Sequence, residues 1–213
     1  MKKTILTIAL SICAAFSLSA YGFGFGSIPG LGGGGTSGGA NLSASQDQLV
    51  KSYVAGSKDV LNSQAEIATA VGLKDQAATC KATADALTTG ATKDNLESAD
   101  KAMSQSSKSV SDALASNPKM NADAKKHFAV GLTLLASGVL SYSGMAKDVS
   151  NFQSGVSSAS PMELEKLSSG IYIVKSLPSN IKNLGAALNN AVNFAKSHDI
   201  PVPSDATKAL SKI

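Results

Sequence analysis

The sequence predicts an all-α fold: an antiparallel, up-and-down bundle of about five to six helices, preceded by a signal peptide and a disordered Gly-rich tether. Apolar residues recur at intervals of three and four along most of the chain after residue 43, which is the period of one helix face. Alternating β-branched runs are few, and no Asn-Gly or Asp-Gly pair signals a β-hairpin. Short connections between amphipathic helices favour antiparallel neighbours.

The first twenty residues have the layout of a secretory signal peptide. Lys2 and Lys3 precede a charge-free apolar stretch, and small residues then lead to Ala20. This pattern is typical of export and is too short for a spanning helix. Lipidation at Cys13 is disfavoured because Ile12 before it is not small. We expect cleavage after Ala20, or two residues later, and a bacterial protein that resides in the periplasm, is secreted, or associates with the outer envelope.

Residues 21–43 are interpreted as a flexible tether. Half of the residues from 21 to 40 are glycine, which loses much conformational entropy on ordering. A phosphate-binding loop would need a strand before it and a Lys-Ser or Lys-Thr pair at its end, and neither is present. Tyr21, Phe23 and Phe25 alternate with glycine, so these aromatic side chains are candidates for contact with a partner, a membrane surface or another copy of the chain.

Residues 44–213 are predicted to form a single helical-bundle domain. Gly72 and Gly90 should end the first two helices, Thr92 should cap the third, and Ser160 with Glu163 should form a capping box. The predicted segments are 45–71, 74–88, 92–117, 121–155, 160 to a break at Pro178, and from there to 197, with one short turn after residue 204.

The most apolar stretch, 128–145, contains eighteen residues without a charge. Its length allows two interpretations, a buried central helix of the bundle or a helix that enters a membrane after export. Small residues fit a close approach of neighbouring helices in either case; they are Gly131, Ser137, Gly138, Ser141 and Gly144.

Residues suited to chemistry are sparse. All nineteen basic residues are lysine, and without the arginine fork nucleic acid is not an expected partner. Removal of the signal leaves Cys80 as a free thiol, which its helical spacing places in the core. Two distant histidines, His127 and His198, and no CxxC or HxxxH spacing predict no metal or cofactor site. No catalytic residues are predicted.

These observations favour an exported, non-enzymatic protein that acts as a binding or structural component of the cell envelope, with a protein or an apolar small molecule as its partner. The alternative is a membrane-associated or membrane-active protein that uses the 128–145 helix or the aromatic tail. An enzyme that pairs Cys80 with a histidine is a third hypothesis.

Overall fold

A computed structural model of the chain describes residues 38–213, and within them all regular secondary structure is helical. The all-α bundle predicted from the sequence is therefore confirmed. The predicted signal peptide, most of the predicted tether, and the aromatic residues Tyr21, Phe23 and Phe25 lie outside the described residues.

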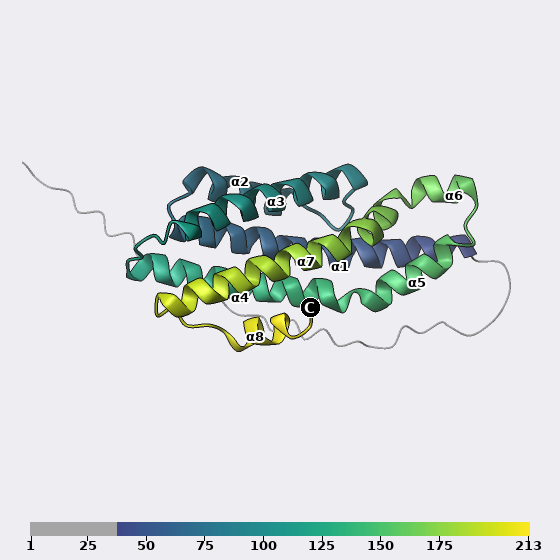
Figure 1. Cartoon of the computed structure of the whole chain (residues 1–213). Helices are drawn as coiled ribbons and strands as arrows, with labels where there is room; N and C mark the ends of the chain where they lie inside the picture. The colour runs from purple at the N-terminus through teal and green to yellow at the C-terminus, as the bar shows by residue number, and fades with distance from the viewer. Residues whose placement is uncertain (1–37) are drawn as a thin grey trace, which may run out of the picture. The chain divides into compact units, whose positions relative to one another are not determined.

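The described helices follow one another with short connections (Figure 1). Their bounds are α1 (Gly38–Ala70), α2 (Lys74–Ala86), α3 (Lys93–Ala115), α4 (Ala122–Gly144), α5 (Ala146–Val156), α6 (Pro161–Lys166), α7 (Ser168–Ser197) and α8 (Ser204–Leu210).

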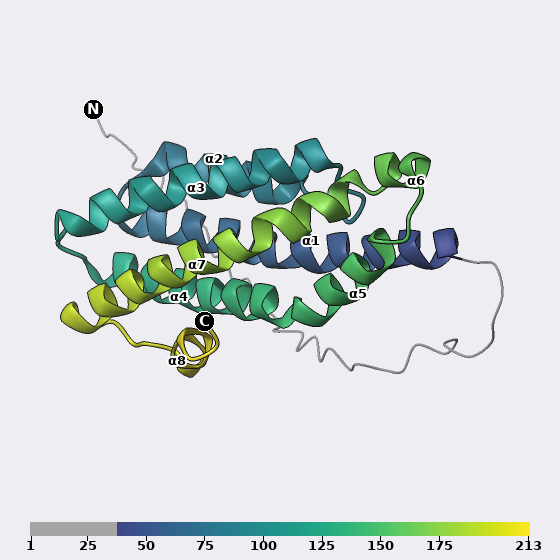
Figure 2. The same ribbon diagram turned by 45° about the vertical axis from the view of Figure 1, so that its right-hand side comes forward.

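Two long antiparallel helices, α1 and α4, form the centre of the bundle (Figures 1 and 2). The α2–α3 hairpin packs on α1, and α7 contacts α4, α1 and α3. The short α5 continues beyond α4 along the N-terminal part of α1, and α8 turns back against α4. Helices α1, α3, α4 and α7 thus surround a common apolar core.

Two helix ends lie where the local sequence predicted them, whereas α2 ends at Ala86, before the predicted stop at Gly90. Gly72 has a φ of 82°, and beyond it the Leu73 N–H donates to the Ala68 carbonyl at 2.8 Å, which closes α1. At the start of α3, the Thr92 backbone N–H donates to the Asn95 side-chain oxygen at 3.0 Å. These short-range signals depend on few neighbours, so sequence alone identifies them.

Four other boundaries also differ from the prediction. Helix α1 begins at Gly38, so the last residues assigned to the tether are helical. The predicted 121–155 helix divides at Met145, whose N–H bonds to the Tyr142 carbonyl three residues back. The capping box forms, but α6 ends at Lys166 after six residues, with Leu167 as its C-cap. Helix α7 then continues through Pro178 because apolar residues on both of its halves are buried, which outweighs the missing hydrogen bond.

Glycines on α4 allow it to lie very close to α1. A Cβ placed on Gly131 would meet the Ser63 carbonyl oxygen at 2.9 Å, and one on Gly138 would meet a Val60 methyl at 2.6 Å. Seven residues separate the two glycines, so they fall on one face of α4. Gly144 lies at the end of the same helix and has open space around it. We call the region around Gly131 and Gly138 the α1–α4 contact.

Candidate functional site

The most promising site within the described residues is a groove between α3 and α7, with a volume of about 290 Å³. This volume is near the lower end of small-molecule sites, which occupy about 300–1,000 Å³. Five of its seven lining residues are polar and two are apolar. The lining residues are Asp100, Met103, Ser104, Ser107, Asn180, Asn183 and Leu184. We call this feature the α3–α7 groove.

Asp100, on the second turn of α3, is the charged group of the groove. Its half-buried carboxylate accepts hydrogen bonds from side chains of two other helices. Tyr53 of α1 donates to both carboxylate oxygens at 2.7 Å. From α7, Tyr172 donates to Oδ2 at 2.6 Å and the Asn180 amide donates to the same oxygen at 3.0 Å. The carboxylate therefore joins three helices and is held in one orientation.

The phenols around Asp100 are fixed as hydrogen-bond donors. Burial is the largest cause that raises the pKa of Tyr53 far above its usual range, and the charges of Tyr142 and Asp100 act in the same direction. Burial also raises the pKa of Tyr172, and its hydrogen bond to the carboxylate adds to this. A protonated phenol can only donate to a carboxylate, so these bonds have a fixed direction.

Tyr53 also connects the groove to the interior of the bundle. Its ring stacks on that of Tyr142 at a centroid distance of 4.9 Å, and the Tyr142 hydroxyl lies 2.7 Å from the Ser57 hydroxyl. Both tyrosines are fully buried. The acidic side of the groove therefore rests on a rigid aromatic pair, which resists displacement of the carboxylate.

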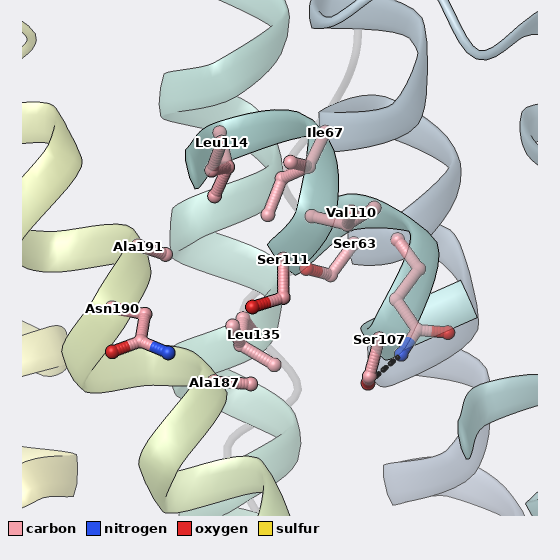
Figure 3. Close-up of a pocket in the computed structure, with 11 residues that line it drawn as sticks. Ser63, Ile67, Ser107, Val110, Ser111, Leu114, Leu135, Ala187, Asn190 and Ala191 are labelled. Atoms are coloured by element: carbon pink, nitrogen blue, oxygen red, sulfur yellow. Dashed lines mark hydrogen bonds between the residues drawn. The ribbon is translucent and has the colours of Figure 1, made fainter. Parts of the chain in front are cut away.

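A second, narrower opening lies beside the groove, among α1, α3, α4 and α7 (Figure 3). Leu114, Leu135 and Val110 contribute to its apolar lining, and its volume of about 30 Å³ suits a water or two rather than an organic ligand. Ser107 lines both openings, and the Gln64 amide donates to its hydroxyl at 2.7 Å. This crevice is a packing gap next to the α3–α7 groove.

Cys80 is fully buried on α2, on the face that its spacing indicated. Its hydrogen-bond partners are both glutamines: the Gln76 amide donates to Sγ at 3.7 Å, and Sγ donates to the Gln64 oxygen at 3.9 Å. Neither His127 nor His198 is among these partners. The thiol therefore has no base beside it that could activate it.

The two histidines belong to separate surroundings. His127, near the start of α4, is exposed and pairs with Glu66 of α1 at 2.6 Å. His198 ends α7, where its ring stacks on Phe194 at 3.8 Å. Within residues 38–213, no group of three or more His, Cys, Asp or Glu side chains is placed to hold a metal ion.

The apolar 128–145 stretch forms most of α4 and supplies part of the core. Phe128, Leu132, Val139 and Tyr142 are fully buried, as its helical period indicated. Val130, on the same helix, is 50% exposed. By length and composition, one stretch of the described chain, Ala122–Val156, could cross a membrane, and half of its most apolar window is buried in the bundle.

Asp100 was not among the site residues predicted from the sequence. Like Asp94 and Glu97, it lies near the start of α3, where a negative charge suits the helix dipole, so its position in the sequence alone resembles that of a solvated surface charge. Two signals point to it in retrospect. Asp100 lies three residues before the buried Met103, at the edge of the apolar stripe of α3, and a buried tyrosine such as Tyr53 needs a partner for its hydroxyl.

Comparisons with protein-family models, with curated proteins and with solved structures found no match. The class of the protein rests on its fold and its groove: an all-α helical-bundle protein with a polar, acidic groove between two of its helices. The characteristic feature of this groove is the Asp100 carboxylate at its wall, which tyrosines of two helices hold by hydrogen bonds.

Proposed function

We propose that this chain is an exported, non-enzymatic binding protein that holds a small polar ligand in the α3–α7 groove. The observation that carries the proposal is the Asp100 carboxylate, which is fixed by three donors at the wall of the groove. Binding sites combine a preformed cavity with a few precisely placed polar groups. This groove has both, and a polar ligand differs from the protein or apolar small molecule that we expected from the sequence.

The composition of the groove supports binding rather than catalysis. Its lining holds one carboxylate, two amides and two hydroxyls, without a histidine, cysteine or lysine. General acid–base catalysis needs a group that exchanges protons near the working pH, and nucleophilic catalysis needs a base next to the nucleophile. The one carboxylate of the lining, Asp100, binds Tyr53, Tyr172 and Asn180 rather than Ser104 or Ser107. The groups present therefore suit recognition.

Export is the second part of the proposal, and residues 1–20 support it through their charged start, apolar centre and small residues before Ala20. The test is a fusion of residues 1–30 to alkaline phosphatase, which is active only outside the bacterial cytoplasm. We expect an active fusion, and an inactive one when Leu6 and Ile8 are replaced by Asp. Equal activity of the two fusions would contradict export by this segment.

The binding test uses the mature chain, residues 21–213, and thermal shifts with a panel of amines, carboxylates, sugars and nucleosides. At least one class should raise the melting temperature in proportion to its concentration. Ser104→Leu should abolish the shift because Ser104 is exposed in the groove and forms no recorded hydrogen bond with another described residue. Gln105→Leu, on the adjacent exposed position outside the lining, is the control. A panel without any shift would contradict the proposal.

A membrane-associated protein is the second candidate, and the apolar Ala122–Val156 stretch favours it. In this alternative, either α4 leaves the bundle or the aromatic residues 21–25 insert. Flotation of the mature chain with vesicles of anionic phospholipid separates the candidates. We expect no flotation. Flotation that is lost on Val130→Asp would establish α4 as the membrane contact, because Val130 is exposed and its change spares the core.

A further inference from the structure

We propose that the ligand of the α3–α7 groove is a small organic cation whose primary or secondary ammonium group binds the Asp100 carboxylate. This inference rests on the proposed binding function and adds the chemical class of the ligand. Three features of the groove carry it: a free position on the carboxylate, a charge without a counter-ion, and a lining that offers further hydrogen-bond acceptors.

The free position is on Oδ1 of Asp100. Oδ2 already accepts from Tyr172 and Asn180 and shares the Tyr53 hydroxyl, whereas Oδ1 has the Tyr53 hydroxyl alone. An ionised carboxylate oxygen accepts about two hydrogen bonds. Oδ1 therefore has capacity for one more donor, and Asp100 lines the groove.

The charge of Asp100 has no counter-ion within residues 38–213. Ion pairs in this part of the chain involve other acidic residues, and most of them are exposed pairs along a single helix. The phenols and the amide that bind Asp100 are neutral, so they orient its charge without cancelling it. A half-buried charge of this kind attracts a cation more strongly than a fully solvated one, because the surrounding dielectric is lower.

The remainder of the groove also offers acceptors. The Asn183 side chain and the Ser104 hydroxyl form no recorded hydrogen bonds with other described residues, and Asn180 uses its amide nitrogen rather than its oxygen. Met103 and Leu184 provide apolar surface for the carbon skeleton of a ligand. An ammonium group with several N–H donors on a short carbon chain matches this combination.

Other ligand classes fit less well. An anion would need Lys or Arg, which the lining lacks. A calcium ion needs six to eight oxygen ligands with several carboxylates, and the groove has one. A quaternary ammonium group is typically held by an aromatic cage, yet no aromatic residue lines the groove. An ammonium that carries N–H groups remains.

The experiment measures binding of 1,4-diaminobutane by titration calorimetry, with 1,4-butanediol as the neutral analogue and tetramethylammonium as the analogue without N–H donors. We expect the diamine to bind at least about tenfold more tightly than either analogue, and less tightly as salt rises. Ser104→Leu should weaken diamine binding by about tenfold or more through steric block, whereas Gln105→Leu should leave it unchanged.

Two charge variants test the role of Asp100. Asp100→Asn should weaken diamine binding by about tenfold or more, with circular dichroism to verify its fold. Ser104→Asp keeps the Asp100 network and adds a carboxylate to the groove, so it should tighten diamine binding even if Asp100→Asn does not fold. Unchanged binding in a folded Asp100→Asn, or weaker binding in Ser104→Asp, would overturn the inference.

The outcomes also separate this inference from the proposed function. If a sugar or carboxylate from the wider panel binds in a way that Ser104→Leu abolishes, while the diamine does not bind, the groove is a binding site and the ligand class is wrong. If no compound binds, both proposals fail.

Discussion

The α1–α4 contact and the α3–α7 groove are two helix–helix boundaries of one bundle, built from opposite kinds of residue. At the α1–α4 contact, glycines remove side chains so that the helices nearly touch, and a Cβ on Gly131 or Gly138 would collide with α1. At the α3–α7 groove, mostly polar side chains line about 290 Å³ of open space between the helices.

The two boundaries suit different tasks: the α1–α4 contact suits stability, and the α3–α7 groove suits recognition of a ligand. Close packing at the α1–α4 contact maximises dispersion contacts and excludes water, but it leaves no room for a ligand. The α3–α7 groove gives up such contacts and replaces them with a hydrogen-bonded carboxylate. A small bundle can tolerate a polar groove when another boundary is packed this closely.

The largest expected effect is on the α1–α4 contact. Replacing Gly131 and Gly138 together by Ala should destabilise the protein by about 1–3 kcal/mol per site, because each added methyl overpacks a close approach. Gly144→Ala, where no atom lies within 4 Å of the new methyl, should be neutral or stabilise by up to about 1 kcal/mol. Urea unfolding of the unmodified protein, the double variant and Gly144→Ala measures the free energy of unfolding of each. An equal loss of this free energy in the two variants would refute the close-packing account.

The buried phenols should produce the next effect, at alkaline pH. Burial raises the pKa of Tyr53 and Tyr142 far above the ordinary tyrosine value of about 10, so the folded state disfavours their ionisation. The stability that these neutral phenols contribute is fully present below pH 10. Above pH 10, the free energy of unfolding should fall by about 1.4 kcal/mol per phenol for each pH unit. Ultraviolet titration of Tyr21→Phe, which removes the fourth tyrosine, should show most phenol ionisation coinciding with unfolding. Ionisation of all three without unfolding would contradict this.

The smallest expected effect is at the edge of the α1–α4 contact, where the Ser137 hydroxyl donates to Asp59 at 2.7 Å. Burial raises the Asp59 pKa, and the Ser137 bond only partly offsets this. A raised carboxyl pKa means that its stability contribution is present at low pH and lost as pH rises through the folded pKa. Asp59→Asn should therefore raise the melting temperature at pH 7 by about 1–3 °C and leave it nearly unchanged at pH 3. A lower melting temperature at pH 7 would show that the charged form is favoured.

The elements that sequence predicted well depend on local chemistry. The capping residues Thr92 and Ser160 and the stop at Gly72 act through neighbours within a few positions, and the apolar period of α4 depends on its own side chains. The break at Met145 and the passage of α7 through Pro178 depend on packing between distant segments, which a single helical period does not encode.

The candidate site was harder to predict for the same reason. Tyr53, Asp100 and Tyr172 come from three different helices. Along the chain, Asp100 lies 47 residues after Tyr53 and 72 residues before Tyr172. Each looks ordinary in its own helix: a core aromatic, a charge near a helix start, and a polar aromatic beside an apolar stripe. Only the packing of α1, α3 and α7 brings them into one network.

The stacked pair Tyr53–Tyr142 gives the protein an intrinsic optical reporter. The chain contains no tryptophan, so its near-ultraviolet circular dichroism arises mainly from tyrosines. Coupling between two rings 4.9 Å apart depends on their mutual orientation, and the Tyr53 hydroxyl bonds directly to the groove carboxylate. Occupation of the groove should therefore be visible in the unlabelled protein as a change in this signal.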